Sequence, residues 1–172
     1  MSLLSRIWRP RGDDQAAVRP LWHRVVEIGR QKAWYADAGA ADTVPGRFDI
    51  ISLVLALVML RMEREPALIT PSVRLTELFV TDMDGQLRQS GVGDLMVGKH
   101  MGKLMGVLGG RLDALRDALA EPGDDALIAA ITRNVTLLPT GDAAVLAGLA
   151  RTLAAQLSAT PAEALLAGEI AR

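Results

Sequence analysis

The feature that most constrains the fold is an apolar run at residues 50–60, which only Ser52 interrupts. As an α-helix this run would be about 16 Å long, roughly half the thickness of the hydrocarbon core of a bilayer. It is therefore too short to cross a membrane. Its side chains are apolar in nearly every direction around a helix, so the run predicts a central helix that other elements must cover.

The composition favours helices as those covering elements. The 172 residues include 26 Ala and 26 Leu, against 13 Val, 8 Ile and 3% aromatic residues. Strong helix formers dominate, whereas a β-sandwich or barrel needs many β-branched and aromatic side chains. We therefore predict an all-α fold, a single-domain bundle of about six to seven helices around the central apolar helix.

Start and stop signals divide the chain into these helices. Proline in a first turn, Asp or Thr at a cap, and glycine-containing breaks mark the ends. The predicted helices cover about residues 18–32, 46–62, 70–89, 94–119, 124–136, 142–158 and 161–170, with a helical turn at 34–37. Asp42 or Thr43 is expected to cap the central helix, and Asp142 is expected to cap the predicted helix at 142–158.

The first residues contain a short amphipathic pattern. One helical face carries Leu3, Leu4, Ile7 and Trp8, with Arg6 and Arg9 beside it. Such a helix is suited to an anionic membrane surface. The alternative is a frayed terminus before the Pro10–Asp14 linker. In either case residues 1–16 form a flexible or membrane-touching segment.

Signals for metal, cofactor or covalent chemistry are missing. The chain has no cysteine, and His23 and His100 lie on different predicted helices without a partner at metal-ligand spacing. Asp82-Met-Asp84-Gly85 fails as a calcium loop, because the aligned loop would begin at Val80 and end at Gly91. We therefore predict no metal site and no cofactor. The net charge of −1 also argues against DNA binding.

A row of glycines is the most informative local feature. Gly98, Gly102, Gly106 and Gly110 recur every four residues and so lie roughly on one side of a helix. Each costs about 1 kcal/mol relative to alanine. Three interpretations remain open. Another helix of this chain packs closely against the bare backbone, or the row and its neighbouring methionines form a flexible groove for a hydrophobic client helix. In the third, the segment is bent or partly non-helical at Gly109-Gly110.

Several strings, taken in their order and spacing, carry a family resemblance. They are Val18–Leu21, Trp34–Asp37, Asp42–Phe48 before the apolar run, Leu78-Phe79, Asp82–Asp84, Leu87-Arg88, Gly91–Asp94, and the basic helix from Lys99 through Lys103 to Gly110-Arg111. Together, over residues 18–120, they resemble the ubiquinol–cytochrome c chaperone family. The chain departs from the family pattern at Gln89-Ser90, at Leu108-Gly109 and at Val54.

The resemblance implies a helical assembly factor, not an enzyme, that acts in the biogenesis of the cytochrome bc complex. Mitochondrial members associate with ribosomes and hold newly made cytochrome b. The expected partners are therefore cytochrome b or another hydrophobic membrane-protein client, the ribosome and a membrane surface. The start of the chain does not resemble a mitochondrial transit peptide, so we expect a bacterial cytoplasmic protein peripheral to the inner membrane.

The resemblance also divides the chain. Residues 17–120 would form the chaperone-like helical domain, and residues 121–172 an Ala/Leu-rich helical extension that packs on it. The Asp42–Arg47 string is interpreted as a cap and hinge that aims Arg47, or as a cap beside an Arg47 that pairs with a nearby acid.

We expect the glycine–methionine helix and the central helix to form an apolar cleft with a basic rim. The predicted partner-binding residues are Arg47, Phe48, Arg88, Asp94, Met96, Lys99, Met101, Gly102, Lys103, Met105, Gly106 and Arg111, and the predicted membrane contacts are Leu3, Leu4, Ile7 and Trp8. The rim would consist of the five Arg and Lys residues in this set. The alternative function is a helical binding module for a small hydrophobic ligand such as lipid, quinone or haem.

Overall fold

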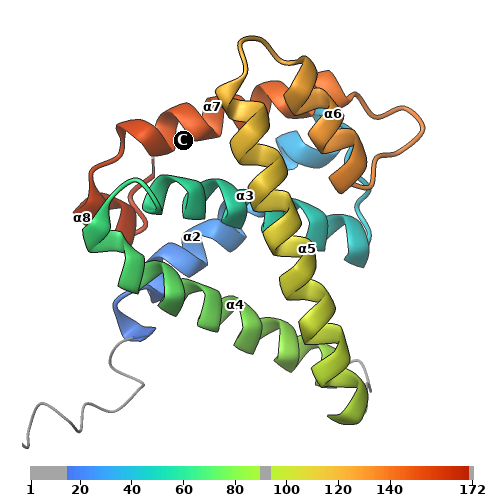
Figure 1. Cartoon of the computed structure of the whole chain (residues 1–172). Helices are drawn as coiled ribbons and strands as arrows, with labels where there is room; N and C mark the ends of the chain where they lie inside the picture. The colour runs from blue at the N-terminus through green and yellow to red at the C-terminus, as the bar shows by residue number, and fades with distance from the viewer. Residues whose placement is uncertain (1–14, 90–93, 171–172) are drawn as a thin grey trace, which may run out of the picture.

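The computed structural model describes residues 15–89 and 94–170, with the side chains of 86–89 and 94–101 left aside. Within this part the chain forms seven α-helices and two short helical turns (Figure 1). They are α2 (Arg19–Gly29), η2 (Ala33–Asp37), α3 (Val44–Met62), η3 (Pro66–Leu68), α4 (Ile69–Gln89), α5 (Asp94–Ala120), α6 (Asp125–Asn134), α7 (Ala143–Ala159) and α8 (Ala162–Leu166). The predicted all-α, single-domain class is confirmed.

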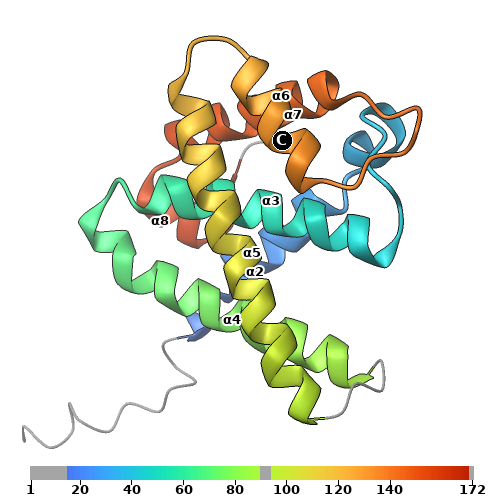
Figure 2. The ribbon, with the colours of Figure 1, turned by 45° about the vertical axis from the view of Figure 1, so that its right-hand side comes forward.

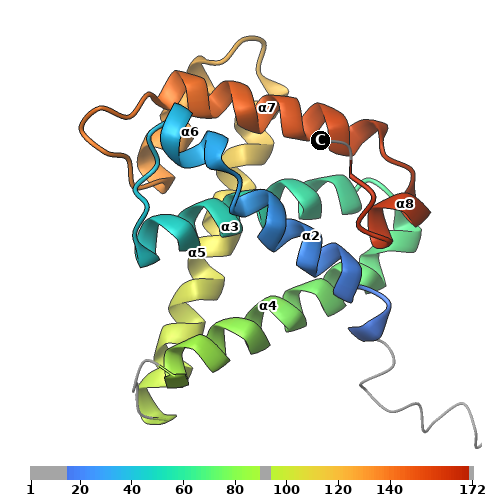
Figure 3. The ribbon, with the colours of Figure 1, turned by 180° about the vertical axis from the view of Figure 1, so that it is seen from behind.

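Helix α3 is the central element. Residues 52–58 are buried without exception, as the apolar run predicts. Figures 1 and 2 show α5 crossing one side of α3, and Figure 3 shows α2 crossing the opposite side; α7 and α4 also contact it. An α-helix that is apolar all round needs cover on every side, and these four helices supply it around residues 52–58.

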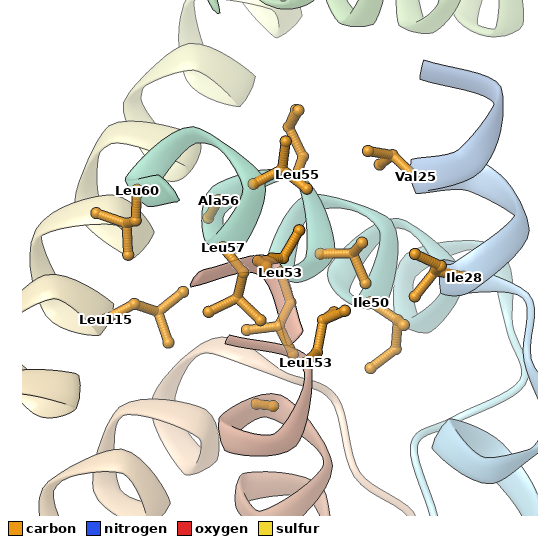
Figure 4. Packing of buried hydrophobic residues seen from close by; sticks show 14 of the residues in the cluster. Val25, Ile28, Ile50, Leu53, Leu55, Ala56, Leu57, Leu60, Leu115 and Leu153 are labelled. Carbon is orange, nitrogen blue, oxygen red and sulfur yellow. The ribbon is translucent and has the colours of Figure 1, made fainter. Parts of the chain in front are cut away.

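Side chains from these covering helices converge on α3. Figure 4 shows Ile28 of α2 beside Ile50, Val25 of α2 on the side of Leu55, and the Leu115 side chain of α5 pointing towards Leu57. Leu153 of α7 is part of the same buried cluster. The cluster therefore includes residues on both sides of position 120, and the Ala/Leu-rich helices contribute to the same core.

Local capping signals set the helix starts. The Thr43 Oγ1 atom accepts a hydrogen bond from the backbone N–H of Gly46 at 3.3 Å, so Thr43 and not Asp42 caps α3. At the start of α7 the Asp142 carboxylate accepts one from Ala144 at 2.8 Å. The predicted helices are all present, although α2 ends at Gly29 and α8 ends at Leu166, earlier than the sequence suggests.

Backbone contacts join the segment before α3 to the segment before α7. Gly39 has a φ of +75°, and a Cβ placed there would lie 2.4 Å from the Gly141 Cα. Beside this contact the Ala41 N–H donates to the Thr136 carbonyl at 2.9 Å, and the Leu138 N–H donates to the Gly39 carbonyl at 2.8 Å. The start of α3 is therefore fixed against the connection between α6 and α7.

No α-helix in the described part of the chain combines the length and the apolar character that a membrane crossing requires. The segment with Leu3, Leu4, Ile7 and Trp8 lies outside the described residues.

The first turn of α3 has no room for a side chain at Gly46, because a Cβ there would lie 2.0 Å from the Ala41 carbonyl oxygen. We expect Gly46→Ala to lower the free energy of unfolding by about 2 kcal/mol through this clash. Gly148→Ala in α7 is the matched control: its Cβ meets nothing within 4 Å, so stability should rise by up to about 1 kcal/mol. Urea unfolding of both variants tests this. Equal stability of the two variants would contradict the close approach between position 46 and the Ala41 carbonyl oxygen.

Candidate functional site

An open hollow of about 580 Å³ lies where α2, α3, α4 and α5 meet. Its wall is mainly apolar, with a few charged side chains at its edges. The lining residues are Val26, Arg30, Val44, Pro45, Arg47, Phe48, Asp49, Ile51, Asp82, Met83, Leu104 and Thr136. Clefts of this size and character are the usual place of binding sites in proteins.

The hollow exists because the cover around α3 is incomplete near its N-terminus. Phe48 and Ile51 are partly buried, whereas the following turns of the helix are fully buried. Val44, at the first position of α3, is 83% exposed. The apolar character of α3 therefore continues beyond the core and onto the surface.

Aromatic rings support the base of the hollow. The rings of Phe48 and Phe79 have centroids 6.2 Å apart, and Trp22 meets Phe79 edge-on at 6.0 Å. Phe79 is fully buried and Trp22 nearly so. These contacts join α2, α3 and α4, and they hold the Phe48 ring in place at the wall of the hollow.

A buried polar network closes the side of the hollow towards α6. Arg111 of α5 is 4% exposed, and its guanidinium forms an ion pair with the Asp49 carboxylate. It also donates to the Asp49 carbonyl at 2.7 Å, to Ser52 Oγ, and to the Asn134 carbonyl at 2.5 Å. The other Asp49 oxygen accepts from the backbone N–H and the hydroxyl of Thr136, at 3.0 and 2.7 Å. The network thus connects α3, α5 and the end of α6.

This network corrects the expected position of Arg111. Its side chain is not on a basic rim; both terminal nitrogens are hydrogen-bonded inside the fold, and its Cζ lies 5.9 Å from the centroid of the Phe48 ring. Asp49, the ion-pair partner of Arg111, was not among the predicted site residues. The available signal was Ser52, the one polar residue in the apolar run, which receives a hydrogen bond from Arg111.

Arg47 does lie at the edge of the hollow, and it is exposed. Its Nε atom pairs with the Asp42 carboxylate at 2.5 Å, so Arg47 pairs with the nearby acid while Thr43 provides the cap. The hydrogen bond from Arg47 lowers the pKa of Asp42, and the same bond raises the pKa of Arg47. Lys103 is exposed on α5 but does not line the hollow.

The glycine row on α5 faces outward. A Cβ built on Gly102, Gly106 or Gly110 would meet nothing within 4 Å. For these three positions the interpretation of close packing within the chain is wrong. The inward face of α5 is formed instead by residues such as Leu108 and Leu115, and α5 contributes Leu104 to the hollow rather than its glycines.

The remaining predicted residues are placed as follows. Phe48 lines the hollow, and Met105 is 38% exposed beside the glycine row. The side chains of Arg88, Asp94, Met96, Lys99 and Met101, like the contacts of Gly98, lie outside the described residues. Val26 of α2 and Arg30, directly after α2, line the hollow but were not among the predicted site residues, since the crossing of α2 over α3 has no local sequence signal.

Residues 36–172 match the family described as "Ubiquinol-cytochrome C chaperone". The chain belongs to this family. It is also similar to the Cbp3 homolog from Brucella abortus, whose crystal structure superposes with a TM-score of 0.80 at 33% sequence identity, over 98% of this chain and 95% of that one. Among curated proteins no relative matches.

Family membership confirms the resemblance found in the sequence and extends it. The match continues to residue 172, so it includes the helices beyond position 120. A ubiquinol–cytochrome c chaperone is an assembly factor for the cytochrome bc complex and not an enzyme. Within the described part of the chain, no three His, Cys, Asp or Glu side chains are grouped as around a metal ion.

The buried network predicts a large cost for removing Arg111. Arg111→Met would leave the Asp49 carboxylate without its cation in a mostly buried site, and we expect the free energy of unfolding to fall by about 3 kcal/mol. Arg47→Met removes an exposed ion pair and should change stability little. Urea unfolding compares them. In addition, Asp49→Ala should cost much less in the Arg111→Met background than alone; additive losses would contradict a direct pairing.

The outward position of the glycine row predicts that substitutions there increase stability. We expect Gly102→Ala and Gly106→Ala each to raise the free energy of unfolding by about 1 kcal/mol, because the methyl group meets no neighbour and restricts the unfolded chain. Gly29→Ala is the control, since its Cβ would lie 2.9 Å from the Ile51 side chain and should not stabilise. Thermal and urea unfolding provide the measurement. A loss of stability at Gly102 or Gly106 would show that another part of the chain packs there.

Proposed function

We propose that this protein holds newly made cytochrome b during assembly of the cytochrome bc complex, with an apolar client segment in the hollow between α2, α3, α4 and α5. The observation that carries the proposal is the open apolar wall formed by Phe48, Ile51, Met83 and Leu104. A newly made membrane protein exposes apolar helices, and a groove of this kind can cover one face of such a helix.

The chemistry of the wall suits a holding function. Most of the surface that lines the hollow is apolar, so apolar contacts would supply most of the binding free energy. Met83 adds an adaptable side chain that can adjust to different client surfaces. The exposed Val44 at the mouth of the hollow contributes little to the fold itself. These features support binding of an apolar segment with later release.

We further propose that the outward face of α5 contacts the client or a partner. Gly102 and Gly106 present bare backbone there, with Lys103 and Met105 beside them, all exposed. Five further residues are proposed to contact the client or partner, and their side chains lie outside the described residues: Arg88, Asp94, Met96, Lys99 and Met101. The proposal also keeps the ribosome as a partner, a location in the cytoplasm, and Leu3, Leu4, Ile7 and Trp8 as a contact with the inner membrane.

A second function is favoured by the size of the hollow. A volume of about 580 Å³ lies within the range of sites for small molecules, so a lipid or quinone could occupy it. Native mass spectrometry of the purified protein separates the two functions. A bound lipid or chromophore would support the ligand binder, and co-isolation with cytochrome b would support the chaperone.

Val44 offers the sharpest test of the chaperone function. Val44→Glu places a charge at the mouth of the hollow, but it should not harm the fold because an acidic side chain in the first turn favours a helix. In cells that lack the native gene, we expect this variant to restore cytochrome b levels poorly and to co-isolate less cytochrome b. Val145→Glu is the matched control, an exposed valine in the first turn of α7 that lines none of this hollow.

Two results would contradict this function. Normal cytochrome b in the cells that lack the gene would exclude the client. Equal rescue by Val44→Glu and Val145→Glu, with both proteins folded, would exclude the hollow as the binding site and leave the outward face of α5 as the candidate.

A further inference from the structure

Three hollows meet at one arginine. Beside the hollow already described, a second of about 690 Å³ lies between α2 and α4, and a third of about 460 Å³ lies beside η2. The α2 and α4 helices lie next to each other, as Figure 3 shows. Arg30, directly after α2, lines all three. The three hollows therefore adjoin one another at Arg30.

A second arginine stands at the same junction. Arg47 lines both the apolar hollow and the hollow beside η2, as Arg30 does. Both guanidinium groups lie near the Tyr35 hydroxyl, where they act against the rise in the pKa of Tyr35 that burial causes. The boundary between these two hollows thus carries two cationic side chains, one that follows α2 and one from α3. We call this boundary the Arg30–Arg47 saddle.

Both arginines have donors available for a ligand. In the described part of the chain, no hydrogen bond or ion pair joins the Arg30 guanidinium to another residue. Arg47 uses only Nε in its bond to Asp42, which leaves both terminal nitrogens for another acceptor. Two guanidinium groups with open donors form a geometry that suits a carboxylate or a phosphate.

The surroundings of the saddle select between these anions. On one side lie Phe48, Ile51 and Leu104, and on the other side lie Ala36, Ala40 and Leu138. Leu138 is 44% exposed. An occupant therefore needs apolar groups on both sides of its anion. A helix with one acidic residue inside an apolar stretch has this arrangement, whereas a phospholipid has its acyl chains on one side of the headgroup only.

We propose that the Arg30–Arg47 saddle recognises a carboxylate within an apolar client helix, with the apolar residues before and after it in the two adjoining hollows. The inference rests on the proposed function, and it adds the chemical class of the client segment. Among the other charges nearby, Lys32 lines the hollow beside η2 and adds positive charge. Asp42 and Asp49 are already paired, with Arg47 and Arg111. Asp82 of α4 lines the apolar hollow and the hollow between α2 and α4, but not the hollow beside η2.

A matched pair of peptides tests the inference. Each is a designed amphipathic helix of about 20 residues with a Leu/Ala face and an uncharged polar face, and the two differ only in a central Glu or Gln. We expect the full-length protein to bind the Glu peptide about tenfold more tightly in fluorescence anisotropy, because hydrogen bonds to a charged group are the stronger ones. Arg30→Gln and Arg47→Gln should each reduce this difference, and the double variant should abolish it.

Arg133→Gln is the control, an exposed arginine of α6 that lines none of the three hollows. It should keep the full preference for Glu, and Arg30→Lys should keep part of it. Equal binding of both peptides to the native protein would overturn the inference and leave the apolar hollow as a client site. Failure of both peptides to bind would also overturn it, and the Val44→Glu experiment then decides the proposed function separately.

Anionic vesicles distinguish a lipid headgroup from a client carboxylate as the anion that binds the saddle. Binding of phosphatidylglycerol vesicles that depends on Arg30 and Arg47, together with equal binding of the two peptides, would overturn the inference in favour of a lipid headgroup. A preference for the Glu peptide that phosphatidylglycerol vesicles do not remove supports the carboxylate.

Discussion

The structure depends on the need to cover α3. This helix has apolar side chains on nearly every side, so it is stable in water only when α2, α4, α5 and α7 surround it. The cover ends near the N-terminus of α3, where Asp49 and Ser52 bring polar groups to the edge of the core. Arg111 binds both side chains, through an ion pair with Asp49 and a hydrogen bond to Ser52. The hollow begins at this boundary because Phe48 and Ile51 are apolar but no helix covers them completely.

Local signals made most of the fold predictable from the sequence. The apolar run identified α3, and Thr43 and Asp142 are caps at positions where the sequence offered a capping side chain. The Asp49–Arg111 pair was not predictable, because its members lie 62 positions apart and no periodicity connects them. The glycine pattern showed that Gly102 and Gly106 share a side of α5, but not whether that side faces the core. Similarly, Arg30 reaches the site only through the way α2 crosses α3.

The surface retains features that folding alone does not require. Glycines at 102 and 106 weaken α5, yet none of the described residues packs closely against them. Val44 and Leu138 expose apolar side chains on either side of the saddle formed by Arg30 and Arg47. A protein under selection for stability alone would gain from replacing such residues, whereas a chaperone needs apolar surface and bare backbone that are available to a client.

Burial gives the arginines around the hollow opposite roles. Arg111 is enclosed by Asp49, Ser52 and Asn134, so a client cannot compete for its donors without breaking the fold. Arg30 and Arg47 carry the same functional group in contact with water, where each salt link contributes up to about 1 kcal/mol. A carboxylate bound there would fix the register of a client helix without binding it tightly. This suits a chaperone that must release its client to the assembling complex, because most of the holding free energy would come from apolar contacts that the next partner can replace.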